Sequence, residues 1–126
     1  MATTLNRLGT KKPGRSGEAV EFYDTSTANA VLTVTTPTDR ERLRRLAGVY
    51  VKFSTSVTKN VTVTFDSTLG AAFDNLLQTI ALTAAASGSW VPAGDIWLGP
   101  GDAIVAESEA GGAGVTATIR VQLEEW

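Results

Sequence analysis

The sequence contains no cysteine and no histidine. Without cysteine, the chain can form neither a disulfide nor a thiolate metal site, which favours assembly in a reducing cytoplasm. Without histidine, it lacks the most common general base and metal ligand, and with them every Ser-His-Asp or Cys-His arrangement. No apolar run approaches the roughly 20 residues of a transmembrane helix, and residues 1–7 lack the apolar core of a signal peptide. We therefore expect no enzyme of these classes, no membrane partner and no secretion through a signal peptide.

Charge is unevenly distributed, although the total is small. The 126 residues carry a formal net charge of -2, which argues against bulk attraction to nucleic acid. The first 16 residues contain no acidic side chain and four basic ones, Arg7, Lys11, Lys12 and Arg15. Residues 95–126 contain Arg120 and six acidic side chains, Asp95, Asp102, Glu107, Glu109, Glu124 and Glu125. One end of the chain is therefore basic and the other acidic.

The basic N-terminal stretch is also rich in residues that interrupt regular structure. Gly9, Pro13 and Gly14 lie among its basic side chains, a composition typical of an extended arm rather than of a helix or a strand. Two uses are open: a solvated tail, or an arm that lies on an acidic surface such as the C-terminal region of a neighbouring copy. We assign residues 1–16 to this arm and residues 17–126 to one domain, because 43% hydrophobic content is sufficient for one core.

Apolar and polar residues alternate with a period of two along most of the domain, as in antiparallel strands with one buried face. This alternation predicts strands over residues 18–23, 28–35, 49–54, 61–66, 96–98, 103–108 and 115–124. Turns are expected at residues 56–59, where the chain reverses, and at the glycine-rich residues 111–114, which close a C-terminal hairpin. The pattern predicts an all-β fold, an antiparallel two-sheet β-sandwich that is jelly-roll-like and has an extended N-terminal arm.

Two segments do not alternate in this way. Asp39 is positioned to cap a single helical turn in which Leu43 and Leu46 face inward. Residues 69–86 have apolar residues at helical spacing, yet residues 76–83 equally fit an extended strand that follows a turn. We favour the strand for this second segment.

The acidic residues and the glycines offer little chemistry. Four aspartates could supply the oxygen ligands that Ca²⁺ prefers, namely Asp66, Asp74, Asp95 and Asp102. They do not have EF-hand spacing, and aspartate near a turn commonly binds the backbone. The glycines of residues 111–114 neither match a phosphate-loop pattern nor precede a helix. We therefore predict no catalytic, cofactor or metal site, and a protein that is not an enzyme.

Two groups of side chains are better suited to contacts with a partner. The first is a cluster of arginines between predicted strands, Arg40, Arg42, Arg44 and Arg45. Their planar guanidinium groups suit carboxylate recognition at an interface, with a solvated charged surface as the alternative. The second group is Trp90, near a serine-rich turn, and Trp126, which we expect to pack against the domain or a neighbouring subunit. Trp97 is expected to be partly buried in the core.

The run Asp95–Val105, the glycine-rich turn and the alternating residues 115–123 resemble the closing strands of small jelly-roll virion proteins of tailed bacteriophages. Capsid decoration (cement) proteins and the base domains of head fibres are the types concerned. The resemblance implies a non-enzymatic structural protein of the virion, commonly a homotrimer, that is assembled in the host cytoplasm. It implies the major capsid protein or another virion protein as partner. The long basic arm departs from the pattern of these proteins and leaves a place in the capsid, neck or tail open. Our own hypothesis is that the arm and the arginine cluster make the contacts with the partner. It carries over no catalytic residue and no cofactor.

A carbohydrate-binding β-sandwich, such as the receptor-binding or glycan-binding module of a phage fibre, is the alternative. In that case Trp90 and Trp97 are stacking platforms, and Asp95 and Asp102 accept hydrogen bonds from sugar hydroxyl groups. The two hypotheses differ in the basic arm, for which a free-standing lectin domain has no use.

Overall fold

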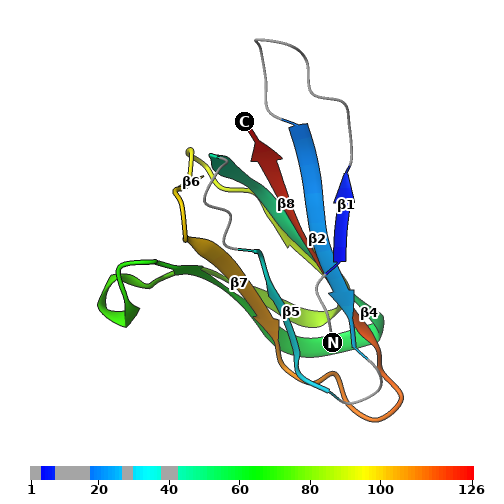
Figure 1. The fold of residues 1–126 in the computed structure, drawn as a ribbon. Coiled ribbons are helices and arrows are strands. Elements are labelled where there is room, and N and C mark those ends of the chain that lie inside the picture. The colour runs from blue at the N-terminus through cyan, green and yellow to red at the C-terminus, as the bar shows by residue number, and fades with distance from the viewer. Residues whose placement is uncertain (1–3, 8–17, 27–29, 38–42) are drawn as a thin grey trace.

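The computed structural model describes residues 4–7, 18–26, 30–37 and 43–126, and for residues 4–7 the backbone alone (Figure 1). The strands are β1 (Thr4–Arg7), β2 (Glu18–Thr25), β3 (Leu32–Thr35), β4 (Arg44–Asp66), β5 (Asn75–Trp90), β6 (Trp97–Leu98), β7 (Ala103–Ser108) and β8 (Ala117–Glu125). A 3₁₀ turn, η1 (Ala71–Phe73), lies between β4 and β5. In the ranges that the structure describes, no helix is long and apolar enough to cross a membrane.

The two long strands, β4 and β5, each pass through both layers of a sandwich. β4 pairs with β8 over Arg44–Phe53 and with β7 over Val61–Asp66, and β5 runs antiparallel beside it. The first layer has the order β1-β2-β8-β4-β5, and the second has the order β3-β7-β4-β5. Each of β4 and β5 contributes one half to each layer. The first layer then has four strands, β2, β8 and the halves of β4 and β5 beside them, and the second has β3, β7 and the other two halves. Together they are the eight strands of a jelly roll. The predicted antiparallel, jelly-roll-like β-sandwich is confirmed.

The core lies between the two layers and consists of the inward members of the alternating pattern. The first layer contributes Val20, Phe22, Ile119, Val121 and Leu123, among others. The second layer contributes Val34, Val61, Val63, Ile104 and Ala106. Because each of the larger apolar side chains gains about 1.5–3 kcal/mol on full burial, this interdigitated set is the main source of the stability of the fold.

β4 differs from the sequence-based prediction in two places. The turn expected at residues 56–59 is wrong, because β4 continues through it and bends instead of reversing. Register shifts against β5 at Lys52, Val57 and Lys59 bend the strand, and Figure 1 shows its ribbon curving from the first layer into the second. The prediction of a helical turn capped by Asp39 is wrong for the last residues of that turn, because β4 already begins at Arg44. Residues 38–42 lie outside the described residues.

Three other segments can be compared with their predictions. The strand favoured within residues 69–86 is confirmed as β5, which follows η1 directly. β3 begins at Leu32, later than the predicted strand over residues 28–35, of which residues 28 and 29 lie outside the described residues. Within the N-terminal arm, Thr4–Arg7 form β1 beside β2, although we expected an arm without a strand.

The prediction that β7 and β8 form a C-terminal hairpin is also wrong, although both strands exist. β7 pairs with β3 and β4, whereas β8 pairs with β2 and β4, so the two strands lie in different layers. The glycine-rich connection crosses from one layer to the other. Gly112 and Gly114 have φ angles of 109° and 74°, which a residue without a side chain adopts at least cost.

Candidate functional site

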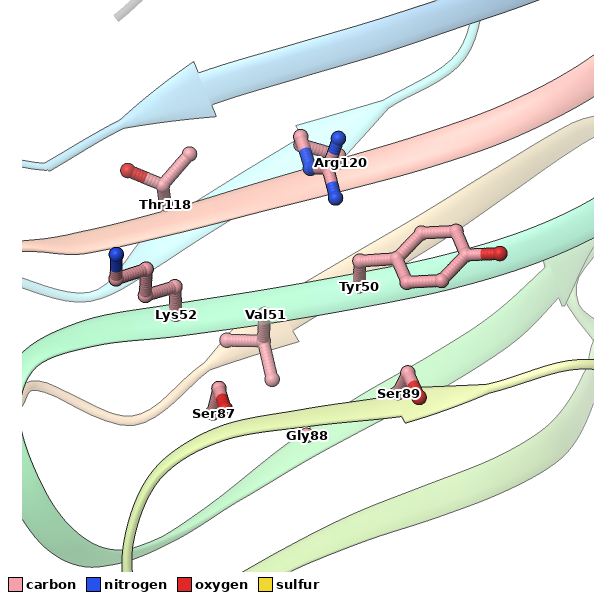
Figure 2. A pocket seen from close by; sticks show the side chains of 8 residues that line it. All are labelled: Tyr50, Val51, Lys52, Ser87, Gly88, Ser89, Thr118 and Arg120. Atoms are coloured by element: carbon pink, nitrogen blue, oxygen red, sulfur yellow. The ribbon is translucent and has the colours of Figure 1, made fainter.

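A groove of about 580 Å³ opens on the outer face of the first layer, where β8, β4 and the end of β5 lie side by side (Figure 2). Because these strands are in register, their outward side chains form two rows across the sheet. The rows are Arg120, Tyr50 and Ser89, and beside them Thr118, Lys52 and Ser87. The groove therefore presents one aromatic ring, two cationic groups and three aliphatic hydroxyl groups.

The ring of Tyr50 is held by a glycine two residues earlier on β4. A Cβ atom on Gly48 would lie 2.9 Å from the hydroxyl oxygen of Tyr50 and 3.1 Å from its Cε2 atom, so the ring occupies the space that a side chain would need. In Figure 2 the ring extends along β4 and presents its broad face in the view of the groove. The missing side chain at Gly48 thus lets an aromatic ring lie against the sheet surface.

Arg120 is oriented by groups on both sides of β8. Its Nε atom lies 3.5 Å from Oε1 of Glu21 on β2, and its guanidinium carbon lies 5.2 Å from the ring centroid of Tyr50 on β4. The carboxylate of Glu21 is buried, whereas the Arg120 side chain is about half exposed. The ion pair and the cation–π contact hold the guanidinium group beside the ring of Tyr50, where the side chain lines the groove.

Lys52 supplies a second positive charge. It is exposed, and the structure gives it no ion pair or hydrogen bond with the residues that it describes. The residues that line the groove include no carboxylate, so an acid and base pair for hydrolysis is not present among them. The arrangement of ring, donors and hydroxyl groups is suited to binding a polar ligand.

Arg44 and Arg45, two of the four clustered arginines that the sequence suggested for an interface, make ion pairs within the chain. Arg44 is 5% exposed and donates from Nε to Oε2 of Glu125 at 2.9 Å, with its guanidinium carbon 5.4 Å from the ring centroid of Phe22. Arg45 binds Glu124 and lies 3.4 Å from a carboxylate oxygen of Asp95. The buried guanidinium group of Arg44 therefore offers no surface to a partner. Of the other predicted contact residues, Arg7 is in β1, of which the backbone alone is described, and Lys11, Lys12, Arg15, Arg40 and Arg42 lie outside the described residues.

This pairing also changes the expected role of the acidic C-terminal region. Three of the carboxylates proposed to receive the arm of a neighbouring copy, those of Asp95, Glu124 and Glu125, already bind arginines of their own chain. Asp102 accepts hydrogen bonds from the backbone N–H groups of Thr68 and Gly99, each at 3.0 Å, which is the turn role that the sequence suggested. Asp102 therefore holds two loops together.

The tryptophans are arranged differently from the prediction. Trp97 is 42% exposed instead of partly buried in the core, and its neighbour Leu98 is the buried residue of β6. The ring of Trp97 lies 6.2 Å from that of Trp126, with 51° between the planes. Trp126 contacts its own domain, because its backbone N–H donates to the carbonyl of Leu43 at 2.9 Å. Trp90, at the end of β5, is partly buried and packs against the core.

Sequence reasoning missed the residues of the groove. The alternation along residues 49–54 and 115–124 placed their polar members on an outer face, which is where the structure has Tyr50, Lys52, Thr118 and Arg120. The spacing of Gly48 and Tyr50 on one strand was the available local signal. The adjacency of β4 and β8 was not available, because it depends on pairing between distant segments.

The chain matches no protein-family model and no curated protein. It is similar to the solved structure of a pilus protein of Bacillus endospore appendages, with 15% identity, a TM-score of 0.45, and coverage of 94% of this chain and 97% of that chain. It is also similar to a variant of a family 29 carbohydrate-binding module complexed with mannohexaose, with 12% identity, a TM-score of 0.41, and coverage of 99% and 93%. A family 16 carbohydrate-binding module has 8% identity, a TM-score of 0.39, and coverage of 84% and 75%. Similarities this low assign no function to the chain.

Proposed function

We propose that this β-sandwich is a saccharide-binding module and that its site is the groove around Tyr50. The observation that carries the proposal is the aromatic ring that lies against Gly48, surrounded by charged and hydroxyl side chains from neighbouring strands. A sugar ring has polarised C–H groups on its faces and hydroxyl groups around its rim. The negative face of an aromatic ring attracts the C–H groups, and side chains beside the ring can bind the hydroxyl groups.

The surroundings of Tyr50 supply both kinds of hydrogen-bonding partner. The hydroxyl groups of Thr118, Ser87 and Ser89 donate and accept, whereas Arg120 and Lys52 only donate. Arg120 is already restricted by Glu21, so ordering it on a ligand costs less side-chain entropy than ordering a free arginine. These groups lie on strands that are paired within the sheet, which keeps the spacing between the ring and the donors constant.

The pair of Trp97 and Trp126 is another exposed aromatic surface on the first layer. Its ring planes are inclined by 51°, so the two rings do not form one flat platform for a sugar chain. The acidic residues near it, Asp95 and Glu124, are bound to Arg45. The groove around Tyr50 therefore fits a saccharide better than the tryptophan pair does.

Calorimetric titration of the full chain with a panel of neutral and acidic oligosaccharides tests the proposal. Tyr50→Ala should lower the affinity for a bound saccharide about tenfold, the loss of roughly 1.4 kcal/mol expected for one aromatic contact. Gly48→Ala should weaken binding in the same direction, because the new methyl group displaces the ring while the ring itself stays in the protein.

Trp97→Ala is the matched control, since it removes an exposed aromatic ring away from the groove. It should leave the affinity unchanged. Loss of binding in Trp97→Ala with no change in Tyr50→Ala would place the site on the tryptophan pair and contradict the proposal. Failure of every saccharide in the panel to bind the wild-type protein would contradict the proposed function as a whole.

A structural role in a phage virion is a second candidate function. It rests on the resemblance of residues 95–123 to virion proteins, and the apolar tip of the hairpin between β4 and β5 favours it. Leu69, Phe73 and Leu76 are exposed at this tip, which projects at the left of Figure 1. An exposed apolar group of this kind is typical of a protein-binding surface. Sedimentation with capsids of a tailed phage that encodes this sequence tests the role, and Phe73→Ser should weaken it.

A further inference from the structure

The strand β5 forms the open edge of both layers. Among the described residues it pairs with β4 alone, so its opposite side presents backbone groups without a strand partner. Natural edge strands are usually short or are protected by charged side chains, proline or bulges. β1 and β3, which lie at other edges, have four residues each, whereas β5 has sixteen and contains neither a charged residue nor a proline.

One part of β5 is a regular template for a further strand. Register shifts interrupt the pairing of β5 at its start and again near Ala84, which has a φ angle of 47°. Between them, Gln78–Leu82 pair with Lys59–Val63 without interruption. Ile80 and Leu82 are buried in the core, whereas the remaining side chains of this stretch are exposed. The stretch is therefore anchored to its own domain on one side and free on the other.

The hydrogen bonds of β4 show which residues of β5 turn their backbone toward the open edge. The carbonyl of Asn60 accepts a hydrogen bond of 3.2 Å from the residue that follows β7, so the backbone groups of Asn60 face β7. In an antiparallel sheet, successive residues direct these groups to opposite sides. Val61 therefore faces β5, and its partner Ile80 faces β4. It follows that Thr79 and Ala81 direct their N–H and C=O groups to the open edge.

We propose that β5 pairs antiparallel with β5 of a second copy of this chain, about a two-fold axis at Ile80. In this register, Thr79 of each copy lies opposite Ala81 of the other copy, which gives two equivalent pairs related by the axis. A hydrogen-bonded pair of an antiparallel ladder exchanges two bonds, so the two pairs form about four bonds between the copies. The contact goes beyond saccharide binding and does not depend on it.

The chemistry of the edge selects a second copy as its occupant. Because β5 is uncharged, pairing it with itself places no like charges opposite one another. The outward side chains at the axis, Thr79 and Ala81, are small enough to lie opposite each other.

The test is the mass in solution of the full chain and of one backbone variant, measured by light scattering during size-exclusion chromatography. The wild-type chain should move toward twice its mass of 13.2 kDa as concentration rises. Ala81→Pro removes an N–H group that faces the open edge and leaves the pairing with β4 in place, as proline in an edge strand permits. It should remain monomeric at every concentration, with a circular dichroism spectrum of wild-type shape.

Ala81→Val is the matched control, because it enlarges the side chain and keeps the N–H group. It should dimerise like the wild-type chain. A monomeric wild-type protein across the whole series, a trimer, or a folded Ala81→Pro variant that still dimerises would each overturn the proposal. If Ala81→Pro does not fold, Thr79→Lys replaces it: this substitution keeps the backbone, charges the contact and should also give a monomer. A Thr79→Lys variant that still dimerises would overturn the proposal as well.

Discussion

At the scale of single residues, two adjacent arginines at the start of β4 have opposite environments. Arg44 and Arg45 are the register partners of Glu125 and Glu124 on β8, so each arginine meets a carboxylate on its own side of the sheet. Arg44 turns inward and is almost fully buried with Glu125, whereas Arg45 lies in the partly exposed outer pair. The buried pair matters more for the free energy of unfolding, because a buried charge that loses its partner still carries the cost of removal from water.

Arg44→Met should therefore lower the free energy of unfolding by about 3–5 kcal/mol, since it leaves the Glu125 carboxylate buried without its guanidinium partner. Urea denaturation followed by tryptophan fluorescence measures this loss. Arg45→Met is the matched control and should cost less than about 1 kcal/mol, because its pair is partly exposed. Replacing both partners, Arg44→Met with Glu125→Leu, should recover most of the loss. Equal losses for the two single variants would contradict this account.

At the scale of elements, the loop between β6 and β7 holds the connection between β4 and η1 in place. The two oxygens of Asp102 accept hydrogen bonds from the backbone of both segments. Gly101 has a φ of 87°, and a Cβ atom on it would lie 2.6 Å from the hydroxyl oxygen of Thr68. Both the backbone conformation and the available space therefore require glycine at this position.

Gly101→Ala should destabilise the protein by about 1–3 kcal/mol, the usual cost of a strained backbone conformation, with the contact to Thr68 adding to it. The thermal midpoint and the free energy of unfolding in urea measure the effect. Gly94→Ala is the control, because a Cβ atom there meets no atom within 4 Å. A Gly101→Ala variant as stable as the Gly94→Ala variant would show that the loop adapts without strain.

At the scale of the whole molecule, the first layer is completed only by the last strand of the chain. β8 lies between β2 and β4 and pairs with both, and its inward residues Ile119, Val121 and Leu123 are fully buried. β2 and β4 belong to the N-terminal half of the chain, so their layer depends on contacts between distant segments. Such contacts make folding slow, in the range of milliseconds to seconds that is usual for all-β domains.

A chain truncated after residue 116 should consequently lack a cooperative unfolding transition, because β2 and β4 lose their common partner and the core loses one side. The amide proton dispersion in a two-dimensional NMR spectrum and the urea titration curve both report this. Removal of Trp126 alone is the control and should retain the fold, because the residue is partly exposed and follows β8. A cooperative transition in the longer truncation would contradict the central role of β8.

The sequence allowed the inward and outward faces of most strands to be predicted, because a period of two is local to each strand. Val61 and Val63 are inward on β4 and Val121 on β8, as their alternation indicated. The reversal expected at residues 56–59 failed, since small and polar residues fit a bend as well as a turn, and pairing with β5 on one side decides between them. The groove was missed for a related reason: Tyr50 and Arg120 become neighbours only through the pairing of β4 with β8.

The sequence by itself determined an all-β chain without the side chains of common catalytic triads, with inward residues that could be named strand by strand. Local alternation and composition are sufficient for these properties, because they do not depend on which strands become neighbours. Tertiary structure alone decided that β7 and β8 lie in different layers, that Arg44 is buried while Arg45 is partly exposed, and that β5 is an open edge among the described strands. Each of these depends on hydrogen bonding and packing between distant segments, and that pairing also places Arg120 beside the ring of Tyr50.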